Sequence, residues 1–176
     1  MEVTKVKMVL ESVAPVLYDR FSGINDANDE EARKNAVHKL YVDNEGWLMI
    51  PVDWLKAAIR EASSAIGKKT ESKKRRQAIR AGLFFDGEGF RLQPEKKEPD
   101  LIYAKPVKRG QGAKQTTVVS YRPCVTEWRI DGAATLFGLT PDFVRQCVER
   151  AGLVQGVGGY RPEFGRFRVV SFEEVT

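Results

Sequence analysis

The sequence contains few of the residues on which metalloproteins and many enzymes depend. Among 176 residues there are two cysteines, Cys124 and Cys147, and a single histidine, His38. Two cysteines cannot form a zinc cluster by themselves, and a histidine-dependent mechanism would have only one side chain to use. We therefore expect no metal ion and no cofactor. We expect both cysteines to be reduced and structural, because nothing in the sequence indicates an oxidising compartment.

Long apolar runs are also absent. No stretch approaches the roughly 20 apolar residues that a membrane-spanning helix needs, and residues 1–13 lack the apolar core and cleavage site of a secretory signal. These features favour a cytoplasmic protein with no membrane partner. Because 42% of the residues are hydrophobic and 30% are charged, the chain can bury a core, and its length predicts a single domain over residues 1–176.

Positive charge is concentrated in two segments. The whole chain carries a net charge of +5, whereas residues 68–80 carry +6 and residues 101–126 carry +5, which leaves −6 on the rest. A local positive field of this kind favours a phosphate backbone as the partner. Either segment alone could equally be a solvated loop, because charge runs are often only exposed faces. The side chains expected to neutralise phosphates in the first segment are Lys68, Lys69, Lys73, Lys74, Arg75, Arg76 and Arg80.

Strand and helix patterns alternate in the first half of the chain. Alternating apolar residues predict a strand over residues 3–13, and residues 40–50 predict two short strands around a turn at 43–46. Between them, residues 25–34 are acidic and predict a short helix or a mobile insertion. An amphipathic helix is expected over residues 51–66. Its apolar face is formed by Leu55, Ala58, Ile59, Ala62 and Ile66.

The middle of the chain combines basic residues with turn signals. Residues 67–82 predict a basic loop that runs into a short helix, and residues 82–92 predict a hairpin with Gly87 and Gly89 in its turn. Residues 94–112 predict an exposed loop or a protruding hairpin. The basic side chains in and beside this stretch could contact nucleic acid or a neighbouring subunit equally well. They are Lys105, Lys108, Arg109 and Lys114.

The last third contains a strand, a helix and a strand. Residues 116–130 predict a long strand with a change of phase near Pro123, followed by a turn at Asp131 and Gly132. A helix is expected to begin at Thr140 and Pro141 and to end at Gly152. A final strand is expected over residues 164–170. Since long parallel-type β-α repeats are missing, we predict an α+β fold in which an antiparallel sheet packs on two helices.

The most informative stretch is GLVQGVGGYRPEFGRFRVV at residues 152–170. Its glycines allow positive φ and let the backbone approach a phosphate or another chain closely, while its arginines supply counter-charge. It is not a dinucleotide-binding fingerprint, because the loop precedes a strand and does not open a helix. The candidate binding residues here are Gly156, Gly158, Gly159, Arg161 and Arg166, and residues 156–165 are called the glycine loop below.

Arg161 and Arg166 also have a structural interpretation. They could pair with acids such as Glu163 or Glu149 and hold the last strand in place. The two interpretations differ in what the loss of an arginine would change. A binding role predicts weaker nucleic-acid binding, and a structural role predicts a lower melting temperature.

This helix, glycine loop and RPEFGRF strand resemble the C-terminal region of the RAMP superfamily, the RNA-recognition-like folds that form the backbone of CRISPR effector complexes. The sequence looks most similar to small phage-encoded relatives of that backbone subunit. The resemblance extends to residues 13–17 after the opening strand, to Ile50-Pro51 before the helix, to residues 65–67 at the end of that helix, and to Arg122-Pro123. It therefore touches most of the chain, with the C-terminal motif as its specific part.

The resemblance implies a ferredoxin-like, RRM-like βαββαβ core with protruding basic hairpins. It also implies insertions at residues 22–36 and 94–115, and binding of single-stranded RNA or DNA, often as a head-to-tail homo-oligomer or filament. A phage-encoded protein would act in the host cytoplasm. The charge distribution, taken independently, favours the same groove that tracks a nucleic-acid backbone.

Aromatic residues offer a second mode of nucleic-acid contact. Tyr160 beside Arg161 could stack on a base, although an aromatic next to a glycine loop more often covers the edge of a core. Trp47, Trp54 and Trp128 are expected in the core or in subunit contacts.

Catalysis is not supported by the sequence. Some RAMP relatives cleave RNA with a histidine or a loop aspartate, for which His38, Asp26 or Asp29 would be the candidates. The acidic residues 26–31 lack the spaced glycine and the terminal glutamate of a calcium loop. The leading hypothesis is a sequence-tolerant, non-enzymatic single-strand binder. The alternatives are a RAMP-type endoribonuclease and a protein-binding mimic of a CRISPR backbone subunit.

Overall fold

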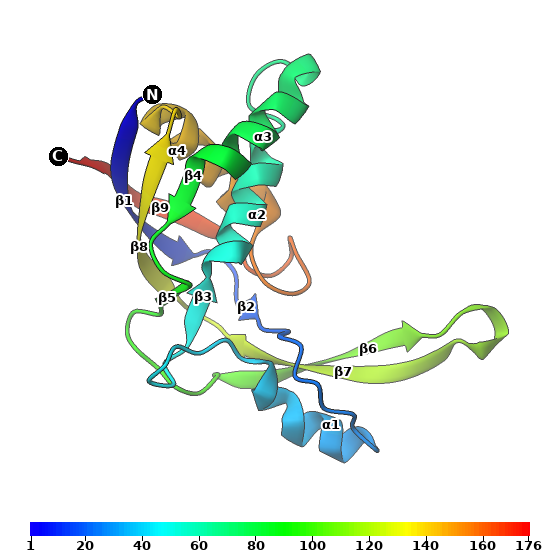
Figure 1. Cartoon of the computed structure of the whole chain (residues 1–176). Helices are drawn as coiled ribbons and strands as arrows, with labels where there is room; N and C mark the ends of the chain where they lie inside the picture. Colours follow the sequence, from blue (N-terminus) through cyan, green and yellow to red (C-terminus); the bar gives the residue numbers. More distant parts are fainter.

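The central feature is an antiparallel sheet of four strands, in a computed structural model that describes all residues, 1–176 (Figure 1). The strands are β1 (Val3–Ser12), β4 (Leu83–Phe85), β8 (Arg129–Phe137) and β9 (Phe167–Val175), and they lie in the order β4-β8-β1-β9. β1 is central and pairs with both β8 and β9. The first and last strands of the chain are therefore neighbours.

Helices connect these strands in a ferredoxin-like succession. The chain runs β1, α2 (Val52–Ser63), β4, β8, α4 (Pro141–Arg150) and β9, which is the βαββαβ arrangement. A further helix, α3 (Ser72–Gly82), follows α2 and leads directly into β4. The predicted α+β, ferredoxin-like fold class is confirmed.

The core lies between the sheet and the helices. β1 alternates, so that Val6, Met8 and Leu10 are buried while the residues between them face the other side of the sheet. α2 turns Leu55 and Ile59 toward them from its apolar face. One cluster of 28 buried residues results, and it extends over both helices and the sheet.

α4 begins as the sequence predicts and ends later than it predicts. The Thr140 hydroxyl accepts a hydrogen bond from the Phe143 backbone N–H, and Pro141 occupies the first turn. Gly152 does not end the helix, because a π-helical turn continues over Ala151–Gln155. Gly152 is instead required by packing, since a Cβ there would lie 2.2 Å from the carbonyl oxygen of Phe167.

Two smaller sheets lie beyond one end of the central sheet. β2 (Val16–Leu17), β7 (Thr116–Val125) and β6 (Leu101–Arg109) form one, in the order β2-β7-β6. β3 (Met49–Pro51) pairs with β5 (Gly89–Arg91) in the other. β6 and β7 form a long hairpin that projects away from the body (Figure 1). Of the stretch 94–112, expected as a loop or a protruding hairpin, residues 101–112 are thus part of a hairpin and residues 94–100 form the loop that leads into it.

The acidic stretch 25–34 contains the start of a short helix, α1 (Asp29–Asn35), which lies beside β7 (Figure 1). The side chain of Asn28 caps it by accepting from the Glu31 backbone N–H. Asp29, Glu30 and Glu31 all lie in its first turn, where negative charge complements the helix dipole. Helix capping and dipole stabilisation account for the clustering of these acids.

The predicted hairpin over residues 82–92 is wrong. β4 pairs with β8, and β5 pairs with β3, so the two strands belong to different sheets. Gly87, with φ +81°, redirects the chain between them. Phe90 inserts into the core, and Gly132 of β8 makes room for its ring, because a Cβ there would lie 3.0 Å from it.

The predicted strand over residues 116–130 is in fact two strands. β7 ends at Val125, and β8 begins at Arg129. Asp131 and Gly132, expected to form a turn, lie inside β8 opposite Val9 and Met8. The short amphipathic repeat of β8 continues through them, and the glycine reflects close packing and not a turn.

Two further boundaries differ from expectation. Residues 40–50 form a single bridge, Val42 with Leu48, and the strand β3 then pairs elsewhere. The last strand begins at Phe167 and not at residue 164, because the Gly165 N–H donates to the Pro15 carbonyl and holds the preceding residues in a turn.

Both cysteines are free and buried. Burial raises the pKa of Cys147 to about 12 and, together with the nearby charge of Asp100, raises the pKa of Cys124 to about 11. Both thiols are therefore protonated at neutral pH. No helix in the structure combines the length and the apolar character needed to span a bilayer.

Candidate nucleic-acid interface

The first basic segment forms the exposed side of α3 and the turn before it. Ile79 is buried against the core, which leaves the opposite side of the helix in solvent. Five of the seven candidate cations are exposed and have neither an ion pair nor a side-chain hydrogen bond within the chain. They are Lys68, Lys69, Lys73, Lys74 and Arg80.

The other two cations of this segment have partners inside the chain. The Arg75 guanidinium donates to the backbone carbonyls of Ser63, Ser64 and Lys68 at 2.8–2.9 Å, and it thereby caps the end of α2. Arg76 donates to the carboxylate of Glu61 on α2. Arg75 has few donors left for a phosphate, whereas Arg76 is half-exposed and pairs at the surface.

The second basic segment lies along the β6–β7 hairpin. Its tip connects the two strands through residues 110–115, and the outer residues on both strands are exposed or only partly buried. The outer half therefore presents charge without a core beneath it. The candidate cations on this hairpin, all exposed and without ion pairs, are Lys105, Lys108, Arg109 and Lys114.

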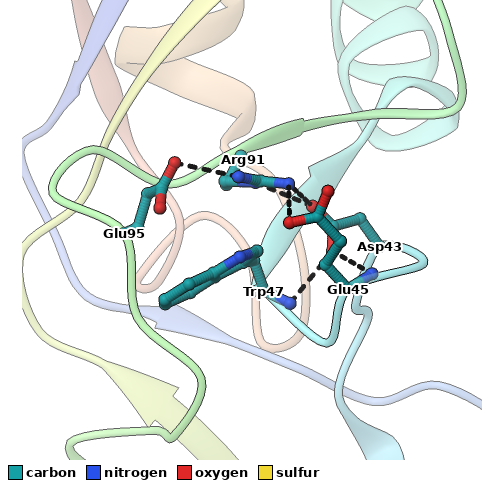
Figure 2. A network of polar contacts seen from close by, with 5 residues as sticks. All are labelled: Asp43, Glu45, Trp47, Arg91 and Glu95. Carbon is teal, nitrogen blue, oxygen red and sulfur yellow. Dashed lines mark hydrogen bonds and ion pairs between the residues drawn. The ribbon is translucent and has the colours of Figure 1, made fainter.

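A polar network anchors the segment that leads into the hairpin (Figure 2). Arg91 on β5 donates to Asp43 at 2.7 Å and to Glu95 at 2.9 Å, and Glu45 lies 3.6 Å away. The Asp43 carboxylate also accepts from the backbone N–H groups of Glu45 and Trp47. The turn at 43–46, β5 and the chain approaching β6 are thus held together by one guanidinium.

This network lowers the pKa of Asp43. Partial desolvation would raise the pKa of its carboxyl, but hydrogen bonds from the Trp47 backbone, from Arg91 and from the Glu45 backbone outweigh that effect and lower it below 3.8. Nearer the hairpin, Asp100 accepts from both the backbone N–H and the hydroxyl of Thr126. These contacts close the base of the hairpin.

The glycine loop packs against the chain's own backbone. A Cβ at Gly156 would lie 2.8 Å from the Phe164 carbonyl oxygen, and one at Gly158 would lie 2.5 Å from that of Leu17. The Gly159 N–H donates to Leu17 at 2.9 Å. The close approach that the glycines predict is therefore made within this chain, between the loop and β2.

Arg161 and Arg166 have no ion pair, and Glu149 pairs instead with Arg145. The pairing with Glu163 or Glu149 that a structural role would use is therefore not formed. Arg161 is exposed and lines a hollow of about 460 Å³ between the glycine loop and α2. Arg166 contributes its backbone, whose carbonyl accepts from Val13 and Ala14, and its side chain is partly exposed.

Tyr160 connects the glycine loop to the hairpin. It is the one residue other than glycine with positive φ, at +50°. Two cations pack against its ring, with Lys105 Nζ 4.3 Å and the Arg122 guanidinium carbon 4.0 Å from its centroid. These contacts favour a role for Tyr160 in fixing the hairpin over a role in base stacking. The sequence does not indicate this role of Arg122, because its partner Tyr160 is 38 residues away and no local pattern links the two.

The three regions lie along one side of the molecule. α3 contacts α2 through Arg76 and Glu61, Glu61 and Arg161 line the same hollow, and Tyr160 contacts the hairpin. In Figure 1, the hairpin extends to the lower right, the glycine loop (orange) lies near the middle of the view, and α3 lies at the top. The two basic segments, far apart in sequence, are thus joined by the loop between them.

The open face of the central sheet offers no comparable surface. Its β1 residues are Lys5, Lys7, Val9 and Glu11, and β9 and β8 place Arg168 and Arg129 beside Glu11. The charges on this face are therefore mixed. Aromatic rings, which RRM domains place on their central strands to stack bases, are found here only at one end, with Phe84 and Phe137.

The tryptophans occupy the positions expected of core and packing residues. Trp128 is 3% exposed and donates to the Ala14 carbonyl. Trp54 packs between Tyr18 and Tyr41. Trp47 belongs to the network of Figure 2.

Of the candidate catalytic side chains, Asp26 and Asp29 line one hollow of about 580 Å³, and His38 is not part of its lining. His38 is exposed, Asp29 accepts from the Tyr121 hydroxyl at 2.7 Å, and Asp26 accepts from Asn35 at 2.8 Å. Nowhere in the chain do three or more histidine, cysteine, aspartate or glutamate side chains gather in a geometry that could hold a metal ion.

Comparison with known proteins identifies a shared fold. No known family model matches the chain, and no curated protein matches its sequence. A chain in the cryo-EM structure of the Type III-B Cmr-β complex bound to cognate target RNA is similar, with a TM-score of 0.50 and 9% identity. The match covers 99% of this chain and 61% of that one, so this chain spans about three fifths of its neighbour's length. At this level of identity the likeness concerns the fold alone.

Proposed function

We propose that the protein binds single-stranded RNA through its phosphates, along the side formed by α3, the glycine loop and the β6–β7 hairpin. The observation that carries this proposal is the arrangement of unpaired cations. Nine exposed cations from the two basic segments have no ion pair and flank one loop, although the chain has 24 acids that could have compensated them. The structural neighbour was solved with target RNA bound, which favours RNA over DNA.

Binding through phosphates implies tolerance of sequence. Lysine and arginine contacts to the backbone carry no base information, and they release counterions from the strand. Affinity should then fall steeply as salt rises and change little between oligomers of different sequence.

A titration on matched RNA and DNA oligomers tests this proposal. Fluorescence anisotropy from about 50 to 200 mM salt should give a log–log slope of about −0.7 for each phosphate contacted. RNA should bind at least as tightly as DNA. An affinity that does not depend on salt, or no binding at low salt, would overturn the proposal.

We also propose that copies of this single domain assemble head to tail along the strand in the cytoplasm. The projecting hairpin, held at its base and without a core of its own, supports this part of the proposal. A heterologous contact that does not close gives an open array, so the assembly should lengthen with the oligonucleotide. Light scattering that gave one fixed size on short and long strands would contradict it.

Two other functions would be recognised in the same experiments. An endoribonuclease would shorten labelled RNA in the presence of magnesium, whereas we expect the RNA to stay intact. If the protein is a protein-binding mimic, then by itself it would bind none of the oligonucleotides.

A further inference from the structure

A cleft between α2 and α3 brings Arg80 of the surface described above together with two cations that lie outside that surface, Lys56 and Arg60. Lys56 and Arg60 lie one turn apart on α2, and Arg80 approaches from α3. Asp53 and Ala57 complete the lining, and the cleft has a volume of about 330 Å³. Its formal charge is therefore +2, from three cations and one acid.

These cations are poorly compensated within the chain. Neither Lys56 nor Arg80 makes an ion pair, and the nearest carboxylate oxygen to Arg60 is that of Glu61, at 3.7 Å. The same Glu61 oxygen already accepts from Arg76. The Nε of Arg60 is buried and has no hydrogen-bond acceptor, which is an uncommon state for a charged donor.

The electrostatics of Lys56 agree with this geometry. Partial burial lowers the pKa of its ammonium, the charge of Arg80 lowers it further, and Asp53 offsets only part of the effect. Its ammonium also lies 4.4 Å from the centroid of the Phe84 ring. An anion in the cleft would relieve this repulsion and supply the missing acceptor.

We propose that the α2–α3 cleft binds a phosphate group through Lys56, Arg60 and Arg80, and that it extends the strand-binding side from α3 onto α2. A phosphate suits the site because its several oxygens can accept from two guanidinium groups and an ammonium at once. The extension of the strand path rests on the proposed function. The phosphate itself could be an internucleotide group of the bound strand or a free phosphate.

NMR of the protein labelled in its lysine side chains tests the cleft directly. Inorganic phosphate should move the Lys56 signal saturably and raise the Lys56 pKa, because a bound anion favours the ammonium form. Chloride at equal ionic strength should produce neither change. A Lys56 signal that responds equally to phosphate and chloride would overturn the proposal.

Variants that each remove one positive charge distinguish a specific role of the cleft from the effect of the protein's net charge. Lys56→Gln and Arg80→Gln should each reduce the magnitude of the log–log salt slope for RNA binding by about 0.7. Arg80→Gln should also abolish the response of the Lys56 signal to phosphate. Lys5→Gln removes the same charge from the open face of the sheet, so its slope should match that of the unmodified protein. Equal slopes for all three variants would contradict a role in strand binding.

The outcomes distinguish this inference from the function on which it rests. If RNA binds but leaves Lys56 and the variant slopes unchanged, the cleft is no part of the interface and the inference fails alone. If RNA does not bind while phosphate still moves Lys56, the proposed function fails and the cleft is a site for free phosphate.

Discussion

The glycine loop and the β6–β7 hairpin are both conspicuous in the sequence, yet the structure uses them in opposite ways. The glycines of the loop meet the backbone of Leu17, Val157 and Phe164 and leave no space for a side chain. The hairpin projects into solvent and is held mainly at its base (Figure 1). Its four candidate cations have no ion pair.

This difference separates two kinds of sequence signal. A glycine cluster indicates that something approaches the backbone closely, and here the approaching group belongs to the same chain. A run of exposed cations that make no ion pair indicates a surface available to an anionic partner. We therefore expect changes in the loop to act on stability and changes in the hairpin to act on binding.

The largest effect is expected at Gly165. Its φ is +79°, and a Cβ would lie 1.7 Å from the Val157 carbonyl oxygen, so Gly165→Ala should cost more than about 3 kcal/mol of unfolding free energy. Gly87→Ala is the control, because φ is +81° there but no atom lies within 4 Å, and about 1 kcal/mol is expected. Denaturant unfolding measures both. Similar costs at the two sites would show that the close packing is not what requires glycine.

A smaller loss of stability is expected at Arg75. Arg75→Met removes donors from three carbonyls near the end of α2 and should cost about 1–3 kcal/mol. The neighbouring Lys74→Gln should leave thermal unfolding unchanged and lower the salt slope for RNA by about 0.7. The comparison fails if the two variants have the same effect on melting.

Substitutions in the hairpin should change RNA binding and leave the free energy of unfolding nearly unchanged. Lys108→Gln combined with Arg109→Gln should lower the salt slope by about 1.4 and leave the unfolding free energy within about 0.5 kcal/mol. Anisotropy and denaturant unfolding on the same preparation check both quantities. A loss of stability without a change of slope would mean that the hairpin is part of the architecture.

Arg161 and Arg166 test the border between the two regions. Both side chains lack an ion pair, so Arg161→Ala and Arg166→Ala should each lower the salt slope by about 0.7 to 1 and leave melting nearly unchanged. Gly158→Ala beside them should show the converse, a cost of about 1–3 kcal/mol with little change of slope. Reduced melting in the arginine variants would assign them to the architecture of the last strand.

The smallest effect concerns the network that anchors the hairpin (Figure 2). Because the pKa of Asp43 is lowered on folding, its contribution is present above its unfolded value of 3.8 and is lost as pH falls through the lower folded value. The stability difference between the native protein and Asp43→Asn should therefore be constant at neutral pH and shrink below about pH 4. A difference that does not change from neutral to acidic pH would exclude ionised Asp43 as the anchor.

Much of the fold could be predicted from local patterns. The alternation in β1, the apolar face of α2 and the Thr140-Pro141 start of α4 are set by nearest neighbours in sequence, and all three are confirmed. The errors arise where long-range pairing decides. Nothing near β4 and β5 indicates that they join different sheets. The sequence around Gly132 is typical of a turn, because its packing partner, Phe90, is distant in sequence.

The sequence predicts which residues of the candidate site are basic, but not which of them are used inside the chain and which are free to bind a partner. The sequence identifies Arg75 as basic, but only the structure places it on the carbonyls that end α2. Arg60 and Arg80 belong to separate helices, and only the structure brings them to one cleft. Net charge in a segment therefore gives an upper limit to the charge available for a partner.

The chain leaves and re-enters the core at adjacent points, since the Gln93 N–H donates to the Arg129 carbonyl at 2.8 Å. The residues between them, including the hairpin, thus form a long loop whose ends are already joined by a backbone hydrogen bond, with Val125 and Trp128 near its end packed in the core. The entropy cost of a longer loop grows only slowly with its length. The outer part of the hairpin, whose residues are exposed or only partly buried, should therefore accept changes of length that leave the ferredoxin-like core the same.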